Sequence, residues 1–212
     1  MSAALQPTAY VVDDDEAIRT LWRWLMESNA IPVQTYATAA EFISAYRRDA
    51  PGCLVLDLNL PGMNGLELQG YLGREGIAIP IVFVTGHADV PAAVSALKGG
   101  AVDFIEKPFG YREVVSVIRQ ALARDAEIRE ARSQRSAVAN RIASLTERER
   151  DVLRRVIEGK QNKVIAAELD ISMKTVEYHR SKVMEKMGAE SVATLVQLTL
   201  GFALIDTPER GG

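Results

Sequence analysis

The chain has 212 residues, of which 48% are hydrophobic and 25% are charged, and its formal net charge is −3. This balance is that of a globular protein and excludes intrinsic disorder, while one cysteine and two histidines exclude an intrachain disulfide, a cysteine-based zinc cluster and a histidine-rich metal site. Without an apolar run of about 18 residues or a secretory signal, we expect a cytoplasmic protein with no membrane partner.

The first 121 residues predict an α/β domain. Short runs rich in β-branched residues alternate with longer helical patterns, and the runs lack polar alternation, which indicates strands buried on both faces. Five such repeats predict a doubly wound, five-stranded parallel sheet. We expect strands at 9–12, 33–36, 53–56, 81–84 and 102–105, and helices that begin near residues 16, 39, 65, 90 and 111.

Charged and polar side chains follow four of these strands. Asp13 and Asp14 follow the first strand and Asp57 the third, while Thr85 follows the fourth and Lys107 the fifth. Because the carboxyl ends of parallel strands share one edge of a sheet, we expect these side chains to meet there. Clustered carboxylates repel one another and favour Mg²⁺. An ammonium and a hydroxyl beside them suit a transferring phosphoryl group, with Asp57 as the nucleophile.

Taken together, the segments 11–15, 57–62, 85–87 and 107–109 resemble the receiver domain of two-component response regulators. The resemblance covers the whole first module and implies a flavodoxin-like fold. It also implies that Asp57 accepts a phosphoryl group from a sensor histidine kinase.

The same resemblance assigns the remaining site residues. Mg²⁺ would be bound by the side chains of Asp14 and Asp57, by the backbone carbonyl of Asn59, and by Asp13 through a water molecule. Lys107 would pair with the free or phosphorylated carboxylate of Asp57, and Thr85 would bond a phosphoryl oxygen. The aromatic switch position falls on Phe104, whose ring has no hydroxyl, so switching there would depend on packing. The family also often has a cis bond between residues 107 and 108.

Ordinary interpretations exist for each segment. The acidic run could stabilise the start of a helix, and the threonine and lysine could belong to a turn and to the surface. Aspartate phosphatases also use a carboxylate nucleophile with Mg²⁺, but a second aspartate usually follows it after two residues, and Asn59 stands there. We therefore expect a protein that is not an enzyme.

A helical connector follows the first module. Residues 114–142 contain no proline or glycine, and every third or fourth residue forms a heptad seam that continues the last receiver helix. Four of the nine seam positions are arginine or alanine. A weak coiled coil and a solvated linker helix both remain open, and the predicted domains are 1–122, the linker 123–143, and 144–212.

The second module predicts four short helices. Thr146 and Glu149 have the spacing of a capping box. Asn162 is the expected cap of the second helix and Ser172 that of the third, and the fourth helix is expected to start at Ser191. Two helices joined by a short turn make a helix-turn-helix, a DNA-binding motif. The positions expected to be exposed on the second of these helices are Lys174, Thr175, Glu177, Tyr178, Arg180, Ser181, Lys182 and Lys186. The two modules differ in the sign of their net charge. Residues 1–121 carry nine basic and 14 acidic side chains, which gives −5, whereas residues 122–212 carry 16 basic and 14 acidic side chains, which gives +2.

The segments 145–149, 162–166 and 174–179 resemble LuxR-type output domains. Their pairing with a receiver resembles the FixJ/NarL class, and the segment 99–109 favours its FixJ-like branch. The resemblance implies base contacts through Glu177, Tyr178 and Ser181. The residues expected to contact phosphates are Lys163, Lys174, Thr175, Arg180 and Lys182.

These parts predict a transcription regulator that is switched by phosphorylation. The phosphorylated receiver would form a homodimer through its fourth helix, fifth strand and fifth helix, and would present two recognition helices to promoter DNA. RNA polymerase is a further expected partner. The alternative is an adaptor whose second module binds protein, and a steep salt dependence of binding would favour DNA.

Overall fold

The computed structural model describes residues 6–86 and 90–202, so residues 1–5, residues 203–212 and His87 of the third receiver-like segment lie outside the described residues. The chain divides into two units, Met1–Glu130 and Ala131–Gly212. None of the described helices combines the length and the apolar character needed to cross a lipid bilayer.

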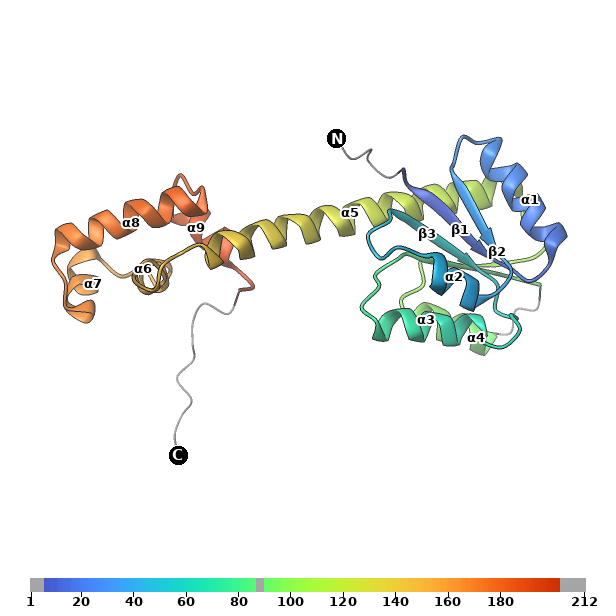
Figure 1. Cartoon of the computed structure of the whole chain (residues 1–212), viewed down its shortest axis with the longest axis horizontal. Coiled ribbons are helices and arrows are strands. Elements are labelled where there is room, and N and C mark those ends of the chain that lie inside the picture. The colour runs from blue at the N-terminus through green and yellow to red at the C-terminus, as the bar shows by residue number, and fades with distance from the viewer. Residues whose placement is uncertain (1–5, 87–89, 203–212) are drawn as a thin grey trace, which may run out of the picture. The chain divides into compact units, whose positions relative to one another are not determined.

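The first unit is built on a parallel sheet, shown in Figure 1, and confirms the predicted doubly wound α/β fold. Its five strands lie in the order β2-β1-β3-β4-β5, and every neighbouring pair is parallel. All residues of β1, β3 and β4 are buried, as their unbroken apolar runs predict. The strands are β1 (Thr8–Val12), β2 (Val33–Tyr36), β3 (Gly52–Leu56), β4 (Ile81–Thr85) and β5 (Asp103–Glu106).

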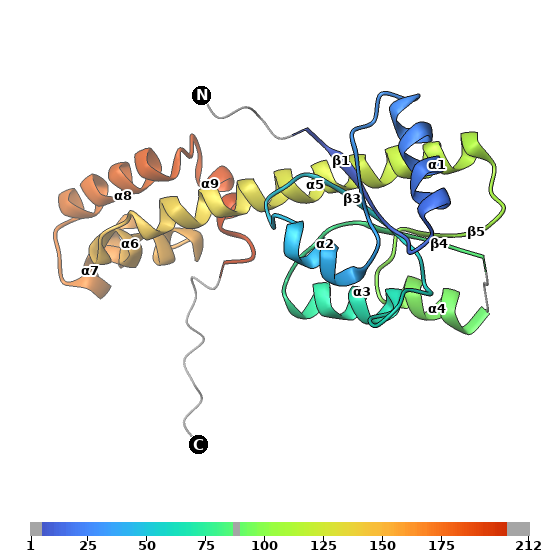
Figure 2. The ribbon, with the colours of Figure 1, turned by 45° about the vertical axis from the view of Figure 1, so that its right-hand side comes forward.

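Helices cover both faces of the sheet, as Figure 2 shows. Alternate strand residues enter two separate cores, one under α1 and α5 and the other under α2, α3 and α4. All five helices begin where the sequence predicts. They are α1 (Glu16–Glu27), α2 (Ala39–Ala45), α3 (Gly65–Arg74), α4 (Val90–Lys98) and α5 (Tyr111–Ala143).

An ion pair between the buried Asp125 and the half-buried Arg129 connects α5 to the start of β3. The Oδ2 atom of Asp125 accepts hydrogen bonds from the Gly52 amide at 2.8 Å and from Arg129 Nε at 2.7 Å. The Arg129 guanidinium also donates to the carbonyl oxygens of Asp49 and Ala50. Gly52 cannot carry a side chain here, because a Cβ atom would lie 2.1 Å from the backbone oxygen of the neighbouring strand.

Replacing Asp125 with alanine is expected to lower the free energy of unfolding of the first unit by about 3 kcal/mol, because it leaves the Gly52 amide and one face of the guanidinium without their acceptor. Urea denaturation of the full chain measures this loss. Replacing the exposed Glu127, two residues further along α5, with alanine is the matched control and should change little. Equal stability of both variants would contradict a stabilising role for the pair.

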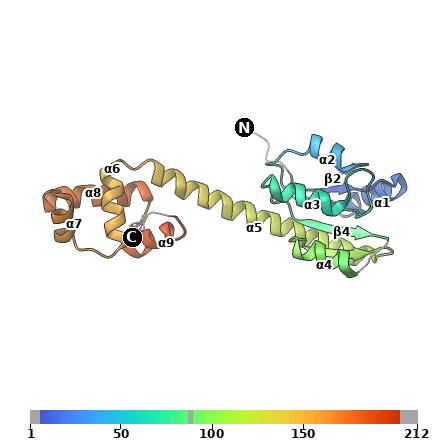
Figure 3. The same ribbon diagram turned by 90° about the horizontal axis from the view of Figure 1, so that it is seen from below.

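The second unit consists of four short helices and the last turns of α5, and Figure 3 shows it from below. Val138 and Ile142 of α5 pack against a core that includes Leu153, Val176 and Met187. The helices are α6 (Glu147–Ile157), α7 (Asn162–Leu169), α8 (Met173–Met187) and α9 (Val192–Thr199). This helical bundle places α7 and α8 as consecutive helices joined by a short turn, as the sequence predicts.

Two of the three predicted helix caps are present, namely the Thr146–Glu149 capping box and the Ser172 cap. Ser191, the expected start of the fourth helix, is the cap of α9, which begins at Val192. The prediction for Asn162 is wrong, because α7 begins at Asn162 and Gln161 occupies the cap position without a side-chain bond. The Asn162 Oδ1 atom instead accepts a hydrogen bond from Arg180 of α8 at 2.8 Å.

The seam residues of α5 contact their own units. Val114 and Ala121 are buried in the first core, Val138 and Ile142 pack on the second, and Arg135 lies over the ring of Phe202. Because these seam residues pack within their own units, little apolar surface of the seam is left to pair with a second helix. The contacts therefore favour a linker helix over a coiled coil. Pairing between two such helices stays a prediction.

Candidate functional sites

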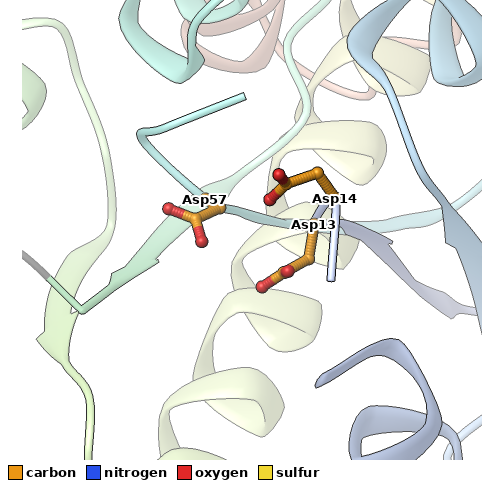
Figure 4. Close-up of side chains that lie close together, drawn as sticks. All are labelled: Asp13, Asp14 and Asp57. Carbon is orange, nitrogen blue, oxygen red and sulfur yellow. The ribbon is translucent and has the colours of Figure 1, made fainter. Parts of the chain in front are cut away.

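Three carboxylates meet at the carboxyl edge of the sheet. The register pairs Val12 with Leu56, and the Asp57 amide donates to the Val12 carbonyl at 2.9 Å, which places Asp13 beside Asp57. Figure 4 shows both side chains together with Asp14. One carboxylate oxygen from each of Asp13, Asp14 and Asp57 lies within 4.8 Å of the others. Asp13 and Asp57 are 3% and 9% exposed, whereas Asp14 is open to solvent.

Lys107 bridges two of these carboxylates. Its Nζ atom lies 2.7 Å from Asp13 Oδ2 and 2.9 Å from Asp57 Oδ2. Burial raises the pKa of Asp13 and outweighs the opposing effect of the ammonium. Burial alone would lower the pKa of Lys107, but its bonds to the two carboxylates reverse the sign and raise it. The ion pair with Asp57 agrees with the sequence, whereas the one with Asp13 is new.

Two neighbouring residues complete the arrangement of this edge. Asp15 caps α1 through a bond from the Ala17 amide at 2.8 Å, so the third aspartate of the run is structural. Arg19 Nη1 donates to the carbonyl oxygens of Asp13 and Asp14, at 2.8 and 2.7 Å, and fixes the backbone of the site. Arg19 is not among the site residues predicted from the sequence, although its position one turn after the Asp15 cap places its side chain near this loop.

The remaining predicted receiver residues lie just after Asp57 in the chain or on the strands β4 and β5. The Asn59 amide donates to Asp57 Oδ1 at 3.1 Å and so orients the carboxylate. Thr85 is fully buried at the end of β4, and its backbone oxygen accepts from the Lys107 amide at 2.8 Å. Phe104 is half-buried, with its ring 6.2 Å from that of Phe83. The Lys107–Pro108 bond is cis, as predicted.

The exposed side of α8 differs in part from the prediction. Lys174, Glu177, Tyr178 and Ser181 are exposed and follow the three- and four-residue spacing of one helix face. The expectation of exposure is wrong for four other residues, which are half-buried because each binds a neighbour. Thr175 bonds Ser172, Arg180 bonds Asn162, Lys182 pairs with Glu185, and Lys186 pairs with Glu149.

These pairings leave few unengaged cations on the motif. Among the described residues of α7 and α8, Lys163 and Lys174 are the basic side chains that the structure shows without an intramolecular bond, and both are exposed. They are therefore the residues whose charge is directly available to a polyanion.

Glu149 links the capping box of α6 to α8. Its carboxylate accepts from the Thr146 amide at 2.8 Å and lies 2.6 Å from Lys186 Nζ. The hydrogen bond from Lys186 lowers the pKa of this buried carboxyl. Glu149 therefore stabilises the second unit in its ionised form.

Replacing Glu149 with glutamine is expected to lower the free energy of unfolding of the second unit by about 1–3 kcal/mol at pH 7. Because the pKa is lower in the folded state, this stabilisation is present above the unfolded value of about 4.3 and disappears as the pH falls through the folded pKa. Hydrogen exchange of α6 amides against pH measures the loss. Glu147→Gln is the exposed control, and an equal loss in both variants would contradict the assignment.

Comparisons with known proteins cover both units. Residues 9–119 match the response regulator receiver domain, and residues 143–199 match the luxR family of bacterial regulatory proteins. The chain is 43% identical over 191 residues to the transcriptional regulatory protein FixJ of Azorhizobium caulinodans, covering 90% of each protein. It is also 43% identical over 195 residues to the C4-dicarboxylate transport transcriptional regulatory protein DctR of Rhodobacter capsulatus, covering 91% of this chain and 98% of DctR.

A solved structure spans both units as well. The structure of the response regulator StyR matches with a TM-score of 0.84 and 43% sequence identity, and the match covers 92% of this chain and 98% of StyR.

Proposed function

The chain belongs to the response regulators that join a receiver domain to a LuxR-type DNA-binding domain, and from this premise we propose that Asp57 is its phosphoacceptor. Phosphorylation-dependent regulation of transcription is the function of this family. The observation that supports Asp57 is the position of its carboxylate, which is held at the end of a central strand with one oxygen on Lys107 and the other on the Asn59 amide.

The proposed reaction follows from this geometry. A free lone pair of the Asp57 carboxylate attacks the phosphorus of a phosphorylated histidine on a sensor kinase. The P–N bond breaks, a P–O bond forms, and the imidazole leaves as the neutral base after it takes up a proton. The Lys107 ammonium lies where it can balance the charge of the phosphoryl oxygens.

The acidic edge fits Mg²⁺, which receiver domains bind in this pocket. Two buried carboxylates and one exposed carboxylate approach one another closely, and hard oxygen ligands are those that Mg²⁺ prefers. We infer that Asp14 and Asp57 hold the ion by their side chains and Asn59 by its backbone carbonyl, with Asp13 acting through water. The ion would neutralise charge on the transferring group.

The phosphodonor needs a surface beside Asp57. An apolar pocket lined by Ile18, Leu21 and Phe109 opens between α1 and the segment after β5, and Lys107 also lines it. The exposed ring of Trp24 lies 6.2 Å from that of Tyr111 at its margin. We propose that a sensor histidine kinase docks here, because this surface adjoins the reacting carboxylate.

We further infer that the chain is a stoichiometric acceptor and not an enzyme that turns over phosphomonoesters. Asn59 stands where the phosphatases of similar chemistry have a second aspartate, which serves them as an acid and base. Steady release of phosphate from p-nitrophenyl phosphate by the purified chain would contradict this inference.

Phosphorylation would then alter a surface of the first unit. Thr85 and Phe104 are both on the side of the sheet that faces α4, because Phe104 pairs with Phe83, two residues before Thr85. The nearby helix α4 exposes three large apolar side chains, Val90, Val94 and Leu97. We propose that a phosphoryl group on Asp57 draws in the Thr85 hydroxyl, that Phe104 repacks, and that a second copy of the chain then covers this face.

The second unit would act on promoter DNA. We propose that α8 enters the major groove with Glu177, Tyr178 and Ser181 towards the bases, and that Lys163 and Lys174 bind phosphates first. Thr175, Arg180 and Lys182 would follow by exchanging their present partners. RNA polymerase would be recruited to or excluded from the same promoters.

Binding to genomic DNA fragments, with and without acetyl phosphate, tests this function. We expect the phosphodonor to strengthen binding, and the affinity to fall steeply as salt rises, because phosphate contacts release counterions. An affinity that changes neither with salt concentration nor with the phosphodonor would favour the alternative of an adaptor whose second unit binds protein.

A further inference from the structure

An exposed methionine begins the helix that faces DNA in the proposed function. Large apolar side chains exposed on α7 and α8, within the described residues, are Val164, Met173 and Tyr178. Single apolar residues on a surface are ordinary. Met173 differs because it is the first residue of α8, is 49% exposed, and shares a four-residue spacing with Glu177 and Ser181.

The small polar groups next to Met173 bond each other. The Ser172 hydroxyl accepts from the Thr175 amide at 3.1 Å and lies 2.8 Å from the Thr175 hydroxyl. The two small polar side chains that flank Met173 in this turn therefore satisfy each other. What the first turn of α8 offers to a partner is the thioether side chain of Met173 beside the free ammonium of Lys174.

We propose that Met173 contacts the C5-methyl group of a thymine in the major groove and makes the chain prefer thymine at that base pair. The proposal rests on the proposed function, since it requires α8 to lie in the groove. The N-terminal residues of a recognition helix are those that reach base edges, and the thymine methyl is the apolar group displayed there. Met173 continues the face of the predicted base readers, and its flexible chain adapts to a methyl group.

The test removes one methyl group from the DNA at a time. Full-length chain treated with acetyl phosphate selects binding sites from a random duplex library, and the selected duplexes are made again with uracil at each thymine in turn. Uracil pairs like thymine but lacks the methyl group. We expect one thymine in each half-site at which uracil weakens binding about fourfold, the effect of removing one buried methyl-sized group.

Three variants assign this loss to Met173. Met173→Ala should bind the thymine and uracil duplexes equally, about fourfold more weakly than the parent binds thymine. Met173→Leu should keep the preference, because it restores an apolar side chain of similar volume. Val164→Ala is the matched control, since it removes a similarly exposed apolar group, 45% exposed, from α7. It should keep the full preference.

The outcomes separate this proposal from the function on which it rests. If no sequence is selected from the library, the proposed DNA binding fails. If sites are selected but no thymine matters, or if Met173→Ala keeps the parent ratio of thymine to uracil affinity, the proposal for Met173 is overturned. A variant that binds DNA normally but no longer regulates transcription would assign Met173 to a protein partner instead.

Discussion

Replacing Asp57 with asparagine is expected to abolish phosphoryl labelling of the chain by acetyl phosphate. The amide oxygen lacks the charge of the carboxylate that attacks phosphorus, so no acyl phosphate forms. The fold should persist, because asparagine has nearly the same shape and its oxygen can still accept from the Asn59 amide or from Lys107. Intact-mass spectrometry with and without acetyl phosphate measures the loss, and circular dichroism verifies the fold.

A neighbouring aspartate provides the matched control for this loss. Asp15→Asn removes a carboxylate from the same acidic edge, but asparagine caps helices as well as aspartate does, so labelling and stability should remain. Removing divalent cations with a chelator should suppress labelling of the unaltered chain, and added Mg²⁺ should restore it. Undiminished labelling of Asp57→Asn at another residue would refute the assignment of the acceptor.

Much of the first unit could be predicted because its strands are determined by short apolar runs of neighbouring residues. Apolar runs of four or five residues place the strands, and every observed boundary lies within one residue of the expected one. The largest shift is at β5, expected at 102–105 and found at Asp103–Glu106, where Val102 still donates a backbone hydrogen bond to Ile81. Because the carboxyl ends of parallel strands share an edge, the strand predictions alone bring Asp13, Asp57 and Lys107 together.

What could not be predicted depends on contacts between distant residues. The strand ends place Lys107 near Asp13, but they do not tell that its ammonium bonds this carboxylate as well as Asp57. Gly52 and Asp125 are 73 positions apart, and no strand end or periodic pattern predicts their hydrogen bond. At Asn162 a contact with a distant residue overrides a local prediction. A local rule predicts a cap, but Arg180 of the next helix offers its side chain a partner, and α7 starts one residue early. On α8, Arg180 and Lys186 are less exposed than expected for the same reason, because each bonds a residue of another helix.

The position of Lys107 indicates how a change at Asp57 could reach the rest of the unit. Its side chain bonds the ends of β1 and β3, and its backbone amide bonds the end of β4. One residue at the end of β5 therefore connects four strand ends. A phosphoryl group on Asp57 would offer this ammonium a stronger anion than the carboxylate does, and the segment after β5 would move with it.

Replacing Lys107 with methionine keeps the length of the side chain and removes its charge. This change is therefore expected to leave phosphorylation of Asp57 intact and to abolish its effect on DNA binding. The variant should still be labelled at Asp57, since the carboxylate and the Mg²⁺ ligands remain. In the unaltered chain we expect phosphorylation to raise the DNA affinity by about 5–150-fold, the ordinary range of coupling between two sites. In the variant this gain should vanish. Fluorescence anisotropy with labelled DNA and acetyl phosphate measures this gain. Arg74→Met, which removes the charge of an exposed arginine in the last turn of α3, is the control and should retain it. A full gain in Lys107→Met would mean that the signal leaves Asp57 by another route, through Thr85 alone.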